Sequence, residues 1–273
     1  NGILFKGSNF LDVLSTIQNV VMDKTGTLTE GVFKVQEVVF KPDFNQNEIL
    51  EMVNALESHS THPVATAVQN FVGPVNSTIK IENIEEIPGH GLKGIVAGKE
   101  LLVGNFKLMD QFKIVHSVDT QKIIHTVIAV AYDSNFVGYL TIADSIKSDA
   151  KKTVELLNKL KIKVTMLSGD KNTVVKDVAH QLGIKNSFGD LLPEDKVNKI
   201  KEIKARQETV AFVGDGVNDA PVVALSDVGI AMGGLGSDAT IETADVVIQD
   251  DQPSKIPMAI NIGKQTKKIV WQN

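Results

Sequence analysis

The stretch Asp23-Lys24-Thr25-Gly26-Thr27-Leu28-Thr29 directly follows the short apolar run Val20-Val21-Met22. This run predicts a buried parallel strand, cut short on its amino side by the polar residues 18–19. An acidic side chain at the carboxyl end of such a strand stands where an open α/β sheet binds its ligand. Gly26 predicts a sharp turn whose backbone N–H groups can surround a phosphate. We therefore predict that Asp23 is a nucleophile that attacks phosphorus and becomes an acyl phosphate.

Similar apolar runs recur after residue 137, and stretches with helical spacing separate them. The predicted strands are Val164–Leu167, Val210–Val213, Val228–Met232 and Val246–Ile248. The predicted helices are Asp149–Leu160, Lys171–Leu182 and a stretch that begins at Pro193. This alternation predicts an α/β fold, a parallel sheet with helices on both faces.

The middle of the chain lacks this alternation. Polar/apolar patterns predict antiparallel strands at Val32–Phe40, Ile79–Ile87, Leu92–Val103 and His125–Tyr132, with helices at Asn47–Leu56 and His62–Phe71. We interpret residues 32–137 as an α+β domain inserted into a discontinuous domain of residues 1–31 and 138–273. The two crossings, near Gly31 and Gly138, would form a hinge.

The composition limits the class of protein. The chain has 273 residues, a net charge of −5 and no cysteine, so a nucleic-acid partner, a disulfide framework and a Cys-based metal site are not expected. No apolar run approaches the roughly 18–20 residues that cross a bilayer. The start lacks Met and a signal peptide, so we expect a piece of a larger protein. Lys264–Trp271 is either a basic approach to a membrane or an ordinary basic surface helix.

Four separated motifs resemble those of the P-type ATPases, the ion pumps with a DKTGT phosphorylation motif. They are residues 23–29, Leu167–Asp170, Leu192–Lys196 and Val213–Pro221, and they follow the order of that family, with Ser168 where the family usually has Thr. The resemblance spans the chain and implies a haloacid-dehalogenase-like (Rossmann-like) sheet with an inserted α+β nucleotide-binding domain. It also implies ATP and Mg²⁺ as cofactors.

The resemblance implies a role for each motif residue. Asp23 would take the γ-phosphate of ATP, and Asp23, the backbone carbonyl of Thr25 and Asp215 would hold Mg²⁺. Lys196 would neutralise phosphate oxygens, and Ser168 would bind one through its hydroxyl. The remaining motif positions would orient the site or contact the nucleotide: Asn218, Asp219, Gly169 and Asp170. In isolation, Asp23 reads as a capping residue and Lys196 as a solvated lysine.

Thr25 separates two enzyme classes. Soluble phosphatases and mutases of the haloacid-dehalogenase group have a second Asp at this position, which protonates the leaving group and activates water. Thr cannot serve as a general acid or base near neutral pH. An aspartyl phosphate at Asp23 would therefore persist, as a pump requires, and a soluble phosphatase is the alternative. A regulatory ATP-binding module is the non-enzyme alternative.

Three segments of the insertion resemble the nucleotide-domain motifs of the heavy-metal-transporting subclass. They are Glu57–Pro63, Gly89-His90-Gly91 and Val103-Gly104-Asn105. The ring of His62 can stack on adenine, Glu57 can accept a hydrogen bond from its amine, and the glycines admit the ring close to backbone. Taken singly, a Gly-x-Gly is usually a turn and a His before Pro usually begins a helix.

Two further segments refine the resemblance. Asp144–Lys147 is similar to the family's hinge segment, although Asp144 or Ser145 also reads as a helix cap. Met232–Asp238 looks more like the zinc/cadmium/lead pumps than the copper pumps, so a copper pump stays an alternative. The resemblance implies a position at the cytoplasmic face of the cell membrane. It also implies that the missing transmembrane and actuator domains are partners and that membrane helices, not this chain, bind the transported cation.

Overall fold

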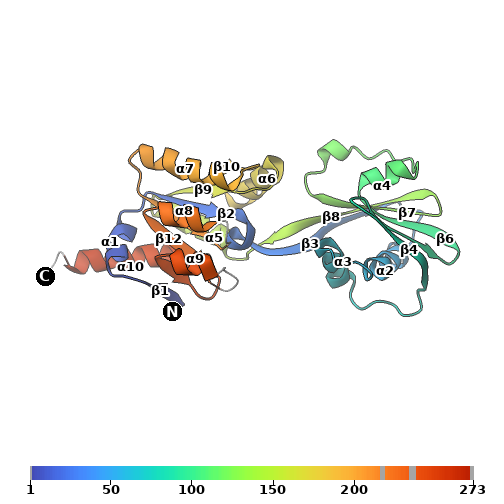
Figure 1. Cartoon of the computed structure of the whole chain (residues 1–273), viewed down its shortest axis with the longest axis horizontal. Coiled ribbons are helices and arrows are strands. Elements are labelled where there is room, and N and C mark those ends of the chain that lie inside the picture. Colours follow the sequence, from blue (N-terminus) through green and yellow to red (C-terminus); the bar gives the residue numbers. More distant parts are fainter. Residues whose placement is uncertain (1, 216–218, 234–237, 271–273) are drawn as a thin grey trace. The chain divides into compact units, whose positions relative to one another are not determined.

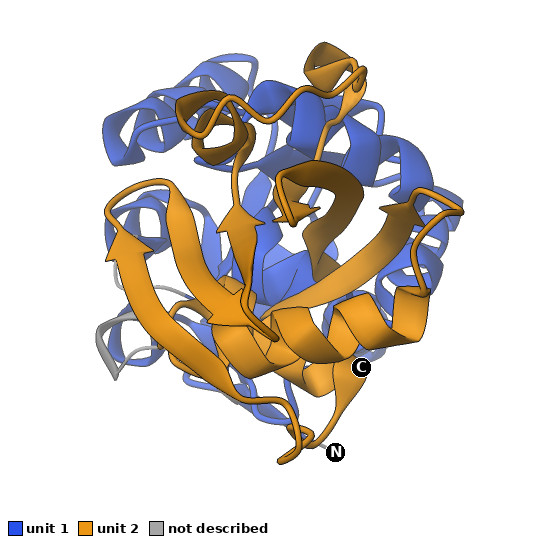
Figure 2. Cartoon of the chain, turned by 90° about the vertical axis from the view of Figure 1, so that its right-hand side faces the viewer, with its two compact units in different colours: residues 1–31, 146–273 blue, residues 32–145 orange. Residues whose placement is uncertain are grey.

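The computed structural model of the chain describes residues 2–215, 219–233 and 238–270. The chain forms two compact units, coloured separately in Figure 2. Unit 1 comprises residues 1–31 and 146–273, and unit 2 comprises residues 32–145. The chain therefore crosses between the units twice, at 31/32 and at 145/146.

Unit 1 is built on a sheet that, in the described residues, has seven strands in the order β1-β13-β12-β11-β2-β9-β10. All neighbouring pairs are parallel except β1 with β13. The strands are β1 (Ile3–Phe5), β2 (Asn19–Asp23), β9 (Lys163–Leu167), β10 (Asn186–Phe188), β11 (Val210–Gly214), β12 (Val228–Met232) and β13 (Val246–Ile248). The predicted α/β class and parallel sheet are thus confirmed.

Helices cover both faces of this sheet, and each face has its own apolar core (Figure 1). One core joins the sheet to α1 (Asn9–Ser15), α5 (Ala150–Lys159), α6 (Asn172–Leu182) and α10 (Lys255–Val270). The other joins it to α7 (Pro193–Ala205), α8 (Ala220–Leu225) and α9 (Asp238–Thr243). Because both faces are covered, β2, β11, β12 and β13 are buried at every position, which explains why their sequences are mostly apolar.

The topology decides where the polar turns meet. β2 lies between β11 and β9 and runs parallel to both, with Asp23 opposite Leu167 and Met22 opposite Val213. The carboxyl ends of all three strands therefore meet at one edge of the sheet, which is where such sheets bind ligands.

Unit 2, whose residues are all described, contains a six-stranded sheet in the order β3-β8-β7-β6-β5-β4. Its strands are β3 (Thr29–Phe40), β4 (Ile81–Ile87), β5 (Gly91–Val96), β6 (Lys99–Gly104), β7 (Thr126–Tyr132) and β8 (Asn135–Ile146). One face packs on α2 (Gln46–Glu57) and α3 (Pro63–Val72), and the other on α4 (Phe106–Gln111), as Figure 1 shows.

Four local expectations were wrong. β2 begins at Asn19, which is buried because its side chain bonds to Glu208 and Thr165. The stretch Leu92–Val103 is a hairpin, β5 and β6, that turns at Ala97 and Gly98, both with positive φ. Asp144 and Ser145 belong to β8 and cap no helix, because α5 begins after Asp149.

The fourth error concerns the second crossing, which lies eight residues beyond the predicted Gly138 because β8 continues through it. Gly138 looked like a hinge, but a Cβ there would lie 2.1 Å from the carbonyl oxygen of Val39. The glycine therefore allows β3 to pack closely against β8.

The basic end of the chain lies in α10, and Trp271 is outside the described residues. Within the described ranges, no helix combines the length and the apolar character that spanning a bilayer requires. Whether Lys264–Trp271 approaches a membrane stays a prediction.

Candidate active site

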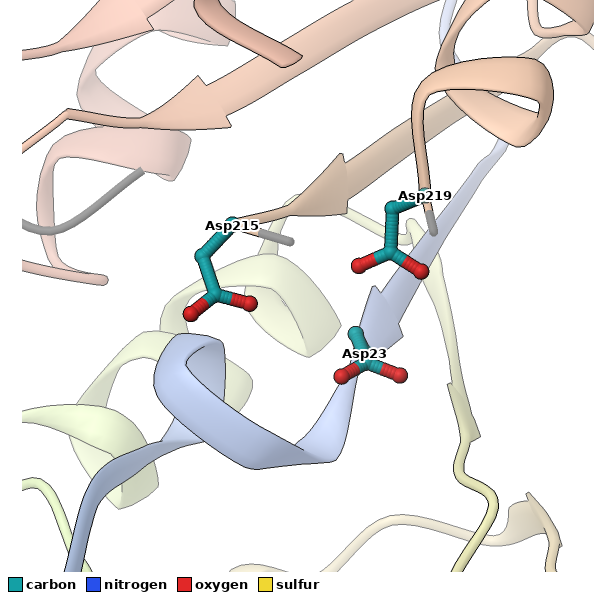
Figure 3. Close-up of side chains that lie close together, drawn as sticks. All are labelled: Asp23, Asp215 and Asp219. Atoms are coloured by element: carbon teal, nitrogen blue, oxygen red, sulfur yellow. The ribbon is translucent and has the colours of Figure 1, made fainter. Parts of the chain in front are cut away.

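Three carboxylates meet at the carboxyl edge of the unit 1 sheet. Asp23 ends β2, Asp215 follows β11, and Asp219 precedes α8. One oxygen from each lies within 4.8 Å of the others, and Figure 3 shows the three side chains gathered at this edge. The first two come together because their strands are parallel neighbours, whereas Asp219 is placed by its position at the N-terminus of α8.

Lys196 supplies a cation to this group. It lies in the first turn of α7, where Pro193 begins the helix and the Asp195 carboxylate accepts a hydrogen bond from the Leu192 amide at 2.9 Å. The Lys196 Nζ donates to Asp23 at 2.6 Å and to Asp219 at 2.9 Å. Burial lowers the pKa of Lys196, but the two carboxylates outweigh burial and raise it overall, so the amine stays charged.

The single positive charge of Lys196 does not balance the three neighbouring carboxylates. Burial, followed by the nearby charge of Asp219, raises the pKa of Asp23 to about 7, although Lys196 opposes the rise. The same two causes raise the pKa of Asp215 to about 6. A divalent cation would relieve this repulsion, and Mg²⁺ prefers a set of hard oxygen ligands such as these. The residues present therefore fit a magnesium ion, with Asp23 and Asp215 as the carboxylate ligands and Asp219 beside them.

The turn after Asp23 is shaped by Gly26. This turn, Lys24–Leu28, has Gly26 at φ 73°, and a Cβ there would lie 1.7 Å from a carboxylate oxygen of Asp215. Glycine is thus needed both for the backbone conformation and for the close approach of Asp215. Thr25 is exposed on the same turn and lines a pocket beside Asp23.

This pocket has a volume of about 320 Å³ and is lined by Asp23, Thr25, Ser168, Gly169, Asp170, Leu191, Pro193 and Lys196. The structure thus brings together residues from three of the four separated motifs, and Asp215 and Asp219 of the fourth lie against Asp23. The Ser168 hydroxyl is buried and accepts a hydrogen bond from the Asp170 amide at 3.1 Å. Asn218, expected to orient the site, lies outside the described residues.

One ion pair at this pocket was missed from the sequence. The buried Lys24 Nζ lies 2.6 Å from an oxygen of Asp170, which was expected to contact the nucleotide. The pair ties the turn after β2 to the turn after β9. The signal was present, since Lys24 is part of the quoted motif, but only the structure shows that its partner is Asp170.

Four of the predicted nucleotide residues form one group in unit 2. Asn105 donates from its side-chain amide to the Gly89 carbonyl at 2.8 Å, and its backbone amide donates to His90 at the same distance. Gly91 and Gly104 are paired across β5 and β6, and a Cβ on Gly91 would lie 2.5 Å from the Gly104 Cα. These two glycines therefore permit close backbone packing, whereas a Cβ on Gly89 would meet open space.

Glu57 and His62 form the other part of the predicted nucleotide set. Glu57 ends α2 and is buried, and burial raises the pKa of its carboxyl to about 7. His62 is exposed and caps α3, with its Nδ1 accepting from the Val64 amide at 3.2 Å. The Gln69 side chain donates to the Glu57 carbonyl at 3.2 Å and so joins the two helices. α2 also packs on β5, the strand that begins at Gly91.

The model of the haloacid dehalogenase-like hydrolases matches residues 17–227, which include Asp23, Lys196 and Asp215. The chain belongs to this family. It is also 46% identical to a zinc-transporting ATPase of Synechocystis sp. (strain ATCC 27184 / PCC 6803 / Kazusa). That match covers 100% of this chain and 38% of the relative, so the chain spans about two fifths of the relative's length.

Two solved structures resemble the chain at 28% identity. A zinc-transporting PIB-type ATPase in an E2.Pi state matches with a TM-score of 0.88, over 100% of this chain and 45% of that one. The catalytic domain of the CPx-ATPase CopB-B, from a study of conformational changes upon nucleotide binding, matches with a TM-score of 0.69 over 96% of both chains. Within its family, the chain is therefore similar along its whole length to the catalytic part of heavy-metal P-type ATPases.

Proposed function

We propose that this chain is the catalytic unit of an ATP-driven heavy-metal exporter and that ATP phosphorylates Asp23. The observation that carries the proposal is the grouping of Asp23, Lys196, Asp215 and Asp219 beside a pocket in which position 25, two residues after the nucleophile, is a threonine and not an acid. This arrangement has a nucleophile and charge neutralisation for phosphoryl transfer, but lacks an acid/base residue at position 25 to complete a hydrolysis.

The transfer requires alignment and charge neutralisation. A carboxylate oxygen of Asp23 forms a bond to the γ-phosphorus, and the bond from that phosphorus to the bridging β–γ oxygen breaks, so that ADP leaves with the electron pair. The Lys196 Nζ donates a hydrogen bond to Asp23, and it can donate to a phosphate oxygen instead as the acyl phosphate forms. Mg²⁺ held by Asp23, the carbonyl of Thr25 and Asp215 would supply positive charge to the phosphate oxygens. The phosphate site would be completed by Ser168 and Gly169, and it would be oriented by Asn218 and Asp219.

The inserted unit provides adenine recognition in this proposal. Glu57, His62, Gly89, Gly91, Gly104 and Asn105 would form the adenine site, supported by the bond from Asn105 to Gly89 and by the open space at Gly89. Unit 2 is then a nucleotide-binding domain and unit 1 a phosphorylation domain. Asp170 lines the pocket and would contact the nucleotide while Lys24 holds it in place.

The transported ion is zinc, cadmium or lead in our proposal, with copper as the alternative. The zinc-transporting relative supports this choice. The remaining three fifths of such a relative would contain the transmembrane and actuator domains, which place this unit at the cytoplasmic face of the membrane and bind the cation. A soluble phosphatase is the rival function that shares the fold.

One experiment separates the pump chemistry from the phosphatase. The chain is incubated with γ-labelled ATP and Mg²⁺, quenched in acid, and treated with hydroxylamine, which cleaves acyl phosphates. We expect protein-bound label that resists acid and is released by hydroxylamine, with little hydrolysis of small phosphate esters. Rapid ester hydrolysis without bound label would favour the phosphatase, and ATP binding without either would favour a regulatory module.

A further inference from the structure

Lys147 makes two hydrogen bonds to the turn that follows Asp23. Its backbone amide donates to the Leu28 carbonyl at 3.0 Å, and its Nζ donates to the Gly26 carbonyl at 2.7 Å. Both acceptors belong to the Lys24–Leu28 turn, and Lys147 is one residue beyond the end of β8. Residues 121 positions apart in the sequence are thus joined at the edge of the active site.

The ammonium group of Lys147 is itself fixed in place. The side chain is only 9% exposed, and its Nζ lies 2.9 Å from a carboxylate oxygen of Asp251. A buried cation is costly unless it is paired and hydrogen-bonded, and here it has both a carboxylate and a carbonyl partner. Asp251 follows β13, so the turn is anchored through Lys147 to a second part of unit 1.

The Lys24–Leu28 turn needs such an anchor. Gly26 has a positive φ and passes against Asp215 with no room for a side chain. Within the turn, the amide and the hydroxyl of Thr29 both donate to the Lys24 carbonyl, while Lys147 holds the carbonyls of Gly26 and Leu28. A displacement of about 1 Å in a group that positions a reaction can cost about 10²-fold in rate.

We propose that Lys147 is a positioning residue for phosphoryl transfer. In the described residues its hydrogen bonds and ion pair go to Gly26, Leu28 and Asp251 and not to the Asp23 group, although its charge lowers the pKa of Asp215. It holds the turn that carries Thr25, and Asp251 holds Lys147. Because Lys147 directly follows β8, the second crossing between the units is hydrogen-bonded to the catalytic turn. The positioning role rests on the proposed function, whereas the anchoring of the turn does not.

The test compares Lys147→Met with Lys147→Arg and with Lys151→Met in the 273-residue chain. Met keeps the length of the apolar stem and removes the donor, Arg restores a cation, and Lys151 is an exposed lysine on α5 that serves as the matched control. Asp251→Asn is also compared, because it weakens the same anchor while it leaves Lys147 in place.

Hydrogen–deuterium exchange is measured without ATP or Mg²⁺. We expect Lys147→Met to speed the exchange of the amides of residues 24–29 by about tenfold or more, while those of β2 and β9 stay protected. Asp251→Asn should move in the same direction by less, and Lys147→Arg should restore most of the protection. Unchanged exchange in residues 24–29, or an equal increase throughout the sheet, would overturn the anchoring role.

Phosphoenzyme formation from ATP gives the second measurement. Lys147→Met should lower the rate at saturating ATP by about tenfold or more and leave the ATP concentration for half-maximal rate unchanged, with recovery in Lys147→Arg. An equal loss in Lys151→Met, or a normal rate in Lys147→Met, would overturn the positioning role. If the wild-type chain forms no phosphoenzyme, the proposed function and the positioning role fail together, and the exchange experiment still decides the anchoring.

Discussion

Glu57 should make unit 2 less stable as the pH rises. The residue is only 7% exposed, and burial raises the pKa of its carboxyl from an ordinary 4.5 to about 7. Between these two values the folded protein keeps a proton that the unfolded chain has released, so the free energy of unfolding falls with increasing pH. The difference between the two pKa values corresponds to a loss of about 3 kcal/mol in the free energy of unfolding. This loss is absent below pH 4.5 and complete above pH 7.

The substitution Glu57→Gln removes the titration and keeps the shape of the side chain. Relative to the wild type, the variant should gain about 3 kcal/mol of unfolding free energy between pH 4.5 and pH 8. Both tyrosines, Tyr132 and Tyr139, lie in unit 2, so tyrosine fluorescence during urea unfolding reports on this unit once Trp271 is replaced by Phe. Glu86→Gln, at an exposed position on β4, is the matched control.

Two results would refute this reasoning. A stability difference between Glu57→Gln and the wild type that does not change with pH would mean that burial does not hold the proton on Glu57. A Glu57→Gln variant that becomes less stable relative to the wild type as the pH rises would mean that unit 2 stabilises the ionised carboxylate.

Three further predictions concern both units. Gly26→Ala should abolish Mg²⁺-dependent phosphorylation because the new Cβ would collide with Asp215. Gly98 has a similar φ but open space around it, so Gly98→Ala should keep the activity, and equal losses in the two variants would implicate the backbone φ alone. Thr25→Asp should speed the decay of preformed phosphoenzyme after an ATP chase by up to about 10²–10⁴-fold, and unchanged decay would remove the main argument against a phosphatase. Residues 32–145 alone should bind ATP without Mg²⁺ and without hydrolysis; calorimetry that shows a folded unit without binding would contradict the adenine site.

The edge strands β1 and β10 of unit 1 are partly exposed and were not predicted from the sequence. The strands between them were predicted well because they are buried on both faces. Such strands are continuous apolar runs, and the acids that follow them must meet at one edge. Asn19 was misjudged because its partners, Glu208 and Thr165, are distant in sequence. A polar residue can lie in a buried strand when its hydrogen bonds are satisfied, and residue patterns do not show those bonds.

The positions of glycines were harder to interpret. Gly138 and Gly98 look alike in the sequence, since each is a single glycine in a stretch with strand-like residues. Gly138 nevertheless lies inside β8, whereas Gly98 lies in the tight turn between β5 and β6. What distinguishes them is the neighbouring backbone, since β3 approaches Gly138 within a distance that no Cβ allows. Lys147 was quoted for its resemblance to a hinge, but its bond to Gly26 depends on the fold and could not be predicted from spacing.

The identity of the phosphorylated residue tests the central claim most directly. After reaction with ATP and Mg²⁺, reduction with borohydride converts an aspartyl phosphate to homoserine, which peptide mass spectrometry locates. We predict homoserine at position 23 in the wild type, and neither homoserine nor bound label in Asp23→Asn, while that variant still binds ATP. Label retained in Asp23→Asn, or homoserine at Asp215 or Asp219, would contradict the account.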